Sequence, residues 1–184
     1  MSDTTTAPAA ADAATQAALE RLNTVIDRLI APDGCPWDST QTPESLTEYV
    51  IEECHELVDA IRSGKTADMV EELGDVAFLI LMLGKLMARA GGPSLADALE
   101  VEAAKMVRRH PHVFSDTTYE NQSEQLKDWD RIKREEKAAA DAEGPKGTYD
   151  SLPRGLPPLT KAYRIHSKAD RVGFCLLYTF RAHE

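Results

Sequence analysis

The sequence predicts an all-α fold, a helical bundle of about five main helices with a short helical segment at the C-terminal end. Apolar residues recur at intervals of three and four residues along most of the chain, which is the spacing of amphipathic helices. No segment has the alternation of apolar and polar residues that is typical of a β-strand. Gly and Pro gather between the periodic segments, where they are expected to end helices.

The first predicted helix carries apolar residues at helical spacing from Leu19 to Leu29 and ends at Pro32-Asp33-Gly34. Residues 1–14 before it are rich in Ala and Thr and are expected to form a mobile, disordered tail. The main helical domain, in which we expect any catalytic residues, is therefore predicted to cover residues 15–140.

The second and third predicted helices form a hairpin. Thr42 is expected to cap the second helix, which runs to about Arg62 and closes at Gly64. Thr66 is expected to cap the third helix, in which residues 76–83 are apolar on all sides. Such a segment must be buried all round, either in the core or at a subunit interface.

Three further segments complete the prediction. A fourth helix begins with a capping box at Ser94 and continues to Arg109, where Pro111 ends it. A fifth helix covers residues 123–140, with Leu126, Trp129 and Ile132 facing inward. The Gly- and Pro-rich residues 141–158 are predicted to be a linker, and residues 159–184 a short helical or interface segment.

Composition narrows the class of function. The net charge of −10, from 31 acidic and 21 basic residues, disfavours nonspecific attraction to nucleic acid or an anionic membrane. The longest apolar run has eight residues, whereas a membrane-spanning helix needs about 20. The three cysteines are widely spaced and no secretory segment is recognisable, which favours a reduced, cytoplasmic protein.

Two acidic pairs on the second and third helices predict a divalent-metal site. Glu53 and Glu56 lie three residues apart, as do Glu72 and Asp75, so each pair shares one helix face. The short turn would bring the pairs together, and two unit charges about 4 Å apart repel by roughly 4 kcal/mol at an effective dielectric near 20. A hard cation such as Mg2+, for which Mn2+ can substitute, resolves this repulsion.

Other metal sites fit this stretch less well. A ferritin-like di-iron site needs two Glu-x-x-His pairs, and here only Glu52 and His55 form one. A zinc protease motif needs His where this chain has Asp59. His55 is therefore interpreted as an ordinary helix residue and Cys54 as part of the core. Gly74 is expected to allow a close backbone approach beside the carboxylates.

A basic helix end and an aromatic residue form a second candidate group. Lys105 and Arg109 lie four residues apart, where two cations are destabilising unless they share an anion. A phosphate clamp and a solvated basic helix end are equally good interpretations on helical grounds alone. Trp129 and Lys133 also lie four residues apart, and a core tryptophan beside a snorkelling lysine competes with a stacking surface for a base.

Several motifs occur together in a fixed order. They are Gly34-Cys35-Pro36-Trp37-Asp38, Gln41-Thr42, E-E-x-x-E at residues 52–56, E-L-G-D at residues 72–75, R-R-H-P-H-V-F at residues 108–114, Trp129-x-x-x-Lys133, L-P-P-L at residues 156–159 and R-V-G-F at residues 171–174. In this combination the chain resembles the MazG family of nucleoside triphosphate pyrophosphohydrolases, over about residues 19–174.

The resemblance implies an all-α fold that hydrolyses nucleoside triphosphates at the α–β linkage, giving the monophosphate and pyrophosphate. It assigns Mg2+ binding to Glu53, Glu56, Glu72 and Asp75, phosphate contacts to Lys105 and Arg109, and base or ribose contacts to Trp129 and Lys133. Glu52 or Glu53 is our candidate for the carboxylate that takes up a proton. It also implies a homodimer or a dimer of dimers.

One departure from the family pattern concerns the end of the chain. Long members carry a second domain just after R-V-G-F, whereas here residues 175–184 are largely apolar and do not match it. A second metal site is therefore not expected, and activity should not depend on it. The alternative is that the chain is a catalytically weak, metal-binding helical module whose function is to bind a partner or to act as a regulator.

Overall fold

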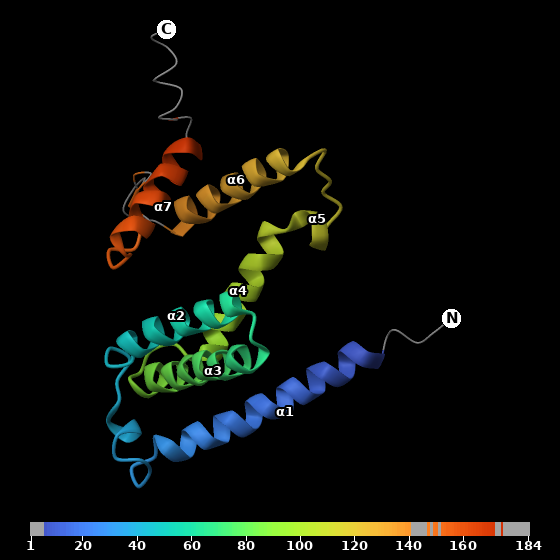
Figure 1. The fold of residues 1–184 in the computed structure, drawn as a ribbon. Coiled ribbons are helices and arrows are strands. Elements are labelled where there is room, and N and C mark those ends of the chain that lie inside the picture. The colour runs from blue at the N-terminus through green and yellow to red at the C-terminus, as the bar shows by residue number, and fades with distance from the viewer. Residues whose placement is uncertain (1–5, 141–146, 148, 151, 172–173, 175–184) are drawn as a thin grey trace. The chain divides into compact units, whose positions relative to one another are not determined.

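The computed structural model describes residues 6–140, 147, 149–150, 152–171 and 174 (Figure 1). Among these residues there are seven α-helices, one short 3-10 helix and no β-strand, so the predicted all-α fold is confirmed. The elements are α1 (Thr6–Leu29), η1 (Asp38–Thr40), α2 (Thr47–Ser63), α3 (Thr66–Arg89), α4 (Leu95–Arg109), α5 (Pro111–Phe114), α6 (Gln122–Ala140) and α7 (Pro158–Arg171).

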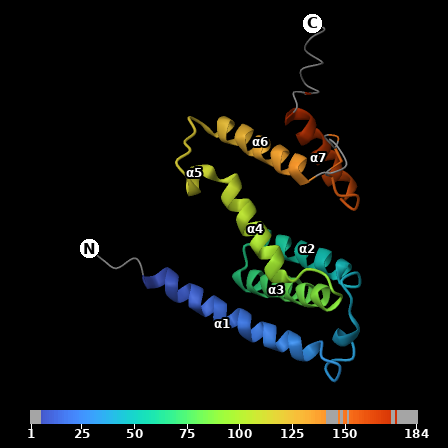
Figure 2. The same ribbon diagram turned by 180° about the vertical axis from the view of Figure 1, so that it is seen from behind.

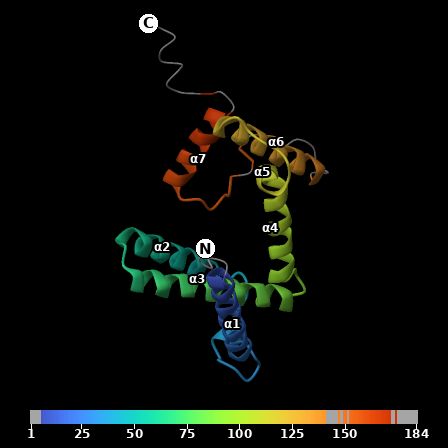
Figure 3. The ribbon, with the colours of Figure 1, turned by 90° about the vertical axis from the view of Figure 1, so that its right-hand side faces the viewer.

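The chain divides into two compact units, residues 1–106 and 107–184. In the first unit α2 and α3 lie side by side as a hairpin (Figures 1 and 2), and Gly64 makes the turn between them with a left-handed φ of 71°. Helix α1 packs against α3 and crosses it on the side away from α2 (Figure 3). The core residues come mainly from α1 and α3: Ile26, Ile30, Leu46, Leu79, Leu81, Met82 and Leu86.

Helix α1 begins at Thr6, earlier than the sequence analysis expected. The segment predicted to be a tail therefore contributes residues 6–14 to the helix, while residues 1–5 lie outside the described part of the chain. Alanine has the highest helix propensity of the common residues, and this stretch is rich in it. The helix propensity of alanine therefore accounts for this extension, which the spacing of large apolar residues did not predict.

The starts of α2 and α3 also differ from prediction. Thr42 caps a single turn ahead of α2, because its Oγ1 accepts the Ser45 N–H at 3.2 Å and Ser45 Oγ accepts the Thr42 N–H at 3.0 Å. These side chains satisfy the turn locally, and α2 begins five residues later, at Thr47. Thr66 is the first residue of α3, and Lys65 before it makes no side-chain capping bond.

The apolar segment of α3 is only partly covered within one chain. Leu79, Leu81 and Met82 are buried, but Ile80 is 45% exposed. Burial on all sides is therefore not reached within the single chain, because α1 and α2 pack against only part of the α3 surface, and burial at a subunit interface stays a prediction.

The beginning of α4 matches the predicted capping box. Ser94 N–H donates to Asp97 Oδ2 at 2.7 Å, and Asp97 N–H donates to Ser94 Oγ at 3.2 Å. Gly84 allows this start to approach α3, since a Cβ at that position would lie 2.6 Å from Leu95 Cβ. His110 is non-helical, as Pro111 predicted, but Pro111 then begins the short helix α5, which the sequence analysis missed.

In the second unit, α6 begins one residue before the predicted helix 123–140 and ends where predicted, and α7 (Pro158–Arg171) begins one residue before the predicted segment 159–184. Trp129 and Ile132 are partly buried, whereas Leu126 is 55% exposed and was wrongly expected to face inward. Much of the predicted linker, and the C-terminal residues 175–184, lie outside the described residues. None of the helices in the described part of the chain has the length and apolarity needed to span a membrane.

Candidate metal site and nucleotide contacts

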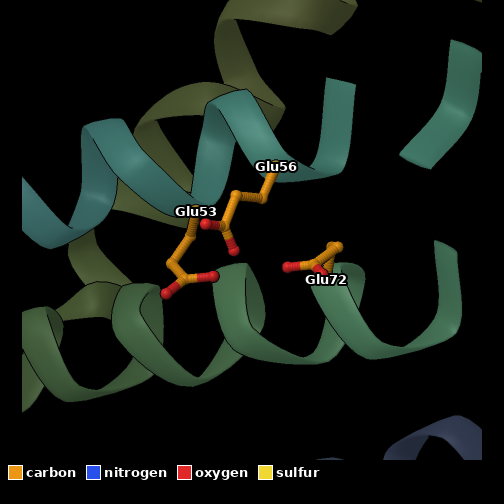
Figure 4. Close-up of side chains that lie close together, drawn as sticks. All are labelled: Glu53, Glu56 and Glu72. Carbon is orange, nitrogen blue, oxygen red and sulfur yellow. The ribbon is translucent and has the colours of Figure 1, made fainter. Parts of the chain in front are cut away.

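Three of the predicted metal ligands come together between α2 and α3. Glu53 and Glu56 lie on one face of α2, and Glu72 reaches toward them from α3 (Figure 4). One carboxylate oxygen from each residue lies within 4.8 Å of the others. The hairpin turn at Gly64 therefore does what the spacing predicted, because it sets the two acidic faces opposite each other.

The spacing of these oxygens suits a small hard cation. Mg2+ binds oxygen ligands at about 2.1 Å in octahedral geometry, so two of its ligands are about 3.0 Å apart when adjacent and about 4.2 Å apart when opposite. The carboxylate oxygens, which lie within 4.8 Å of one another, therefore have to close by up to about 2 Å, which rotation of their side chains can supply. An all-oxygen donor set also favours Mg2+ or Mn2+ over softer metals.

Crowding of like charges changes the titration of this cluster. Partial burial raises the pKa of Glu53, and the charges of Glu56, Asp75 and Glu52 raise it further, while a hydrogen bond with Glu72 opposes them. Partial burial likewise raises the pKa of Glu72, with the charges of Glu56 and Glu53 adding to it. Among the described residues, none of the recorded salt bridges involves Glu53, Glu56 or Glu72.

Two other predicted site residues lie beside the cluster. Asp75 is close enough for its charge to raise the pKa of both Glu53 and Glu72, yet its oxygens are not in the cluster of three. Glu52 precedes Glu53 on α2, is exposed, and is not in the cluster either. The structure therefore brings together three of the four predicted ligands and leaves the fourth nearby.

Two structural interpretations around this site are wrong. Cys54 is exposed and does not belong to the core, since the side of α2 that carries Ala60 is the one that is buried. Gly74 is exposed as well, and a Cβ there would meet none of the described residues within 4 Å. It therefore does not serve a close backbone approach in the part of the chain that the structure describes.

Lys105, a predicted phosphate contact, has an acidic partner on its own helix. Its Nζ forms an ion pair with Glu102, three residues earlier on α4. The lysine side chain is 30% exposed and that of Glu102 is 52% exposed. The carboxylate of Glu102 therefore reduces the repulsion that was expected between Lys105 and Arg109.

In the second unit, Arg109 and Trp129 lie next to each other. The guanidinium carbon of Arg109 is 5.7 Å from the centre of the Trp129 ring, within the range of a cation–π contact. His110 meets the same ring edge-on, with the ring centres 4.8 Å apart. Lys133 is partly buried one turn further along α6. Arg109, Trp129 and Lys133 therefore belong to one local arrangement.

The acidic residues that hold these cations were not predicted from the sequence. Glu136 on α6 accepts hydrogen bonds from Arg108 and Arg109, and Glu102 pairs with Lys105. One signal was present, because Glu136 lies seven residues after Trp129 and therefore on the same helix face. Its partners on α4 are far away in sequence, so periodicity alone could not identify them.

Comparison with known proteins gives consistent similarities. Residues 41–114 match the model of the MazG nucleotide pyrophosphohydrolase domain. The chain is 38% identical over 157 residues to the nucleoside triphosphate pyrophosphohydrolase of Escherichia coli K12, covering 85% of this chain and 59% of that protein. It is 37% identical over 155 residues to the nucleoside triphosphate pyrophosphohydrolase/pyrophosphatase MazG of Thermotoga maritima, covering 84% and 58%.

A solved structure supports the same relationship. The crystal structure of a mazG-related protein from Thermotoga maritima aligns with a TM-score of 0.54 and 29% sequence identity, over 62% of this chain and 97% of that one. The chain spans less than two thirds of the length of the curated relatives named above. The matched region 41–114 contains both helices that carry the carboxylate cluster.

Proposed function

The chain belongs to the MazG family, and from this premise we propose that it is a Mg2+-dependent nucleoside triphosphate pyrophosphohydrolase. It would cleave the α–β linkage and release pyrophosphate and a nucleoside monophosphate. The observation that carries the proposal is the cluster of Glu53, Glu56 and Glu72, whose oxygens converge within 4.8 Å inside the family-matched region. Its biological role would be the removal of unwanted nucleotides or the regulation of nucleotide pools, in the cytoplasm.

The carboxylates of the hairpin would hold the metal. Glu53, Glu56 and Glu72 are the proposed ligands, and Asp75 would join them by a change of side-chain rotamer. A bound Mg2+ would neutralise the triphosphate and lower the pKa of a bound water. Glu52 or Glu53 would take up a proton from the attacking water.

The remaining predicted residues would bind the nucleotide. Lys105 and Arg109 would contact phosphate oxygens, while Trp129 would stack on the base and Lys133 would contact the base or ribose. Lys105 and Arg109 already have acidic partners in the chain, Glu102 and Glu136. A triphosphate therefore has to share these cations with the carboxylates or displace them.

We propose that the chain forms a homodimer or a dimer of dimers through the hairpin. Apolar residues at helical spacing remain exposed on both of its helices, and a second copy of the chain would cover them. They are Ile51, Val58 and Ile61 on α2, and Val70, Leu73 and Ile80 on α3. Light scattering should give a multiple of the 20.2 kDa chain mass, and Leu73→Glu should lower it.

Pyrophosphate release with Mg2+ over a panel of nucleoside triphosphates tests the proposed activity. The parent should release pyrophosphate and monophosphate in equal amounts, and Glu72→Gln, purified in the same way, should not. Release of inorganic phosphate alone would contradict cleavage at the α–β linkage. A parent that binds Mg2+ and nucleotide without turnover would favour the alternative, a regulatory or partner-binding module.

A further inference from the structure

The end of α4 contacts α6 in the second unit through an acid that the proposed function does not use. Glu136 accepts hydrogen bonds on both carboxylate oxygens. Its Oε2 accepts from Nε and Nη2 of Arg109 at 2.9 and 2.7 Å, and its Oε1 accepts from Nε of Arg108 at 3.1 Å. A single carboxylate therefore holds two neighbouring guanidinium groups.

This contact is more shielded from water than the other ion pairs of the same helix. The side chains of Arg109 and Glu136 are 17% and 21% exposed, whereas those of Arg131 and Glu135 are 52% and 61% exposed. Exposed pairs contribute little because water and salt screen them. The hydrogen bond from Arg109, together with that from Arg108, also holds the pKa of Glu136 below its ordinary value, although burial opposes this. Glu136 is therefore ionised and paired at neutral pH.

Glu136 shares a helix face with the proposed base contacts. Trp129, Lys133 and Glu136 follow one another on α6 at intervals of four and three residues, which is the spacing of one helix face. The carboxylate draws Arg109 onto this face, where the guanidinium carbon lies 5.7 Å from the centre of the Trp129 ring. An aromatic surface and a cation are thereby placed side by side.

The array keeps the capacity to bind an anion. Arg108 and Arg109 carry two positive charges and Glu136 carries one negative charge, which leaves a net charge of about +1. Each guanidinium has five N–H donors, and Glu136 accepts two bonds from Arg109 and one from Arg108. The two side chains therefore carry more donors than Glu136 accepts, and the excess suits phosphate oxygens.

We infer that Glu136 is a positioning residue for nucleotide binding: it fixes the guanidinium groups of Arg108 and Arg109 beside the Trp129 ring before the nucleotide arrives. The inference rests on the proposed function, in which Arg109 contacts phosphate and Trp129 stacks on the base. Groups that are already oriented bind their ligand without a further loss of side-chain entropy.

The test compares Glu136→Gln with Glu135→Gln in the full chain. Each variant removes one acid from neighbouring positions of α6, but Glu135 pairs with Arg131 and not with Arg109. Pyrophosphate release is measured with Mg2+ for two triphosphates that differ in base. Glu136→Gln should raise KM about tenfold for both nucleotides, as expected for one charged hydrogen bond, and leave kcat within about twofold. Glu135→Gln should keep the parental KM, and Glu136→Asp, which retains a carboxylate, should recover part of the loss.

Some results would overturn the inference. A folded Glu136→Gln variant with the parental KM would make Glu136 a structural pair only, whatever its melting temperature. A lower kcat at unchanged KM would do the same. If Glu136→Gln does not fold, as judged by circular dichroism, Glu136→Asp decides, because a shortened carboxylate with a parental KM contradicts a positioning role.

A binding measurement separates this inference from the proposed activity. In a Trp37→Phe background Trp129 is the remaining tryptophan of the chain, and its fluorescence can report a titration with inorganic tripolyphosphate. Glu136→Gln should weaken that binding about tenfold, even if the parent proves to have no pyrophosphohydrolase activity. Equal affinities, or a parent that does not bind tripolyphosphate, would overturn the inference.

Discussion

Acidic side chains in two regions of this chain have neighbours of opposite charge. Glu53 and Glu72, in the α2–α3 hairpin, are surrounded by other carboxylates, and partial burial together with this repulsion raises the pKa of each. Glu136 on α6 faces two arginines, and the hydrogen bond from Arg109 lowers its pKa. The carboxylates of the hairpin therefore need a cation from outside the chain, whereas the Glu136 carboxylate already has its cationic partners within the chain.

The largest expected effect follows from removing a charge from the hairpin. Glu53→Gln, Glu56→Gln, Glu72→Gln and Asp75→Asn should each reduce turnover by more than about 100-fold, because loss of a ligand should exceed the roughly 10- to 100-fold effect of outer-shell changes. Glu71→Gln is the matched control, since Glu71 precedes Glu72 on α3 but is not in the cluster. Pyrophosphate release under saturating Mg2+ is the measurement. A fully active Asp75→Asn variant would restrict the metal site to the three convergent glutamates.

Removing the basic residues should have a smaller and different effect. Lys105→Ala and Arg109→Ala should raise KM by about 10- to 100-fold for every base, because each loses a charged hydrogen bond to phosphate. The two variants should differ in stability. Arg109→Ala leaves Glu136, which is 21% exposed, without its main partner, whereas Lys105→Ala leaves Glu102, which is 52% exposed. A change confined to one base would contradict the assignment to phosphate.

Changes at Trp129 should alter selectivity more than rate. Base stacking on an aromatic side chain contributes roughly 1 to 3 kcal/mol, so Trp129→Phe should keep the fold and change the preference among bases by about three- to tenfold. Lys133→Ala should shift the same preference, since it lies one turn further along the same face. Leu126→Ala, at a position 55% exposed on the same helix, is the control. Unchanged selectivity in Trp129→Phe would assign the ring to packing against Arg109 and His110.

The two regions also differ in how much of them could be predicted. The hairpin site depends on local spacing: i, i+3 pairs on two consecutive helices and a glycine turn between them, all visible in the sequence. Even there, the single turn capped by Thr42 and Ser45 displaced the start of α2, because side-chain bonds within a turn compete with the helix. Gly74 shows a second limit: the glycine was expected to allow a close backbone approach, but none of the described residues packs against it.

The arrangement in the second unit depends on contacts between distant segments. Arg109 and Glu136 are 27 residues apart, and no periodic pattern links positions on different helices. The helix bounds of α6 were nearly correct, but which of its faces is buried depends on its neighbours, and Leu126 was misplaced for that reason. The comparison therefore separates what spacing along a helix can specify from what only tertiary packing decides.

A melting experiment without metal tests whether the carboxylates of the α2–α3 hairpin repel one another. In EDTA, Glu53→Gln should melt at the same temperature as the parent or higher, because it removes repulsion among Glu53, Glu56 and Glu72. Saturating Mg2+ should reverse the order, since the metal binds the folded parent more tightly and stabilises it by mass action. Differential scanning fluorimetry in both buffers is sufficient. A variant that melts well below the parent in EDTA would mark Glu53 as a structural partner instead of a metal ligand.

The smallest expected effect is a pH dependence in the second unit. Because the pKa of Glu136 is lower in the folded protein than its ordinary value of 4.5, the folded state binds fewer protons there than the unfolded state. The stabilisation by this carboxylate is therefore complete above about pH 4.5 and is lost as the pH falls through the lowered pKa. The melting temperature of the parent should exceed that of Glu136→Gln by about 2–4 °C at pH 6, and this difference should shrink below pH 4.5. Glu135→Gln should differ less from the parent at pH 6, because its pair with Arg131 is more exposed. A difference between parent and Glu136→Gln that stays constant down to pH 3 would contradict an ionised Glu136 held by the two arginines.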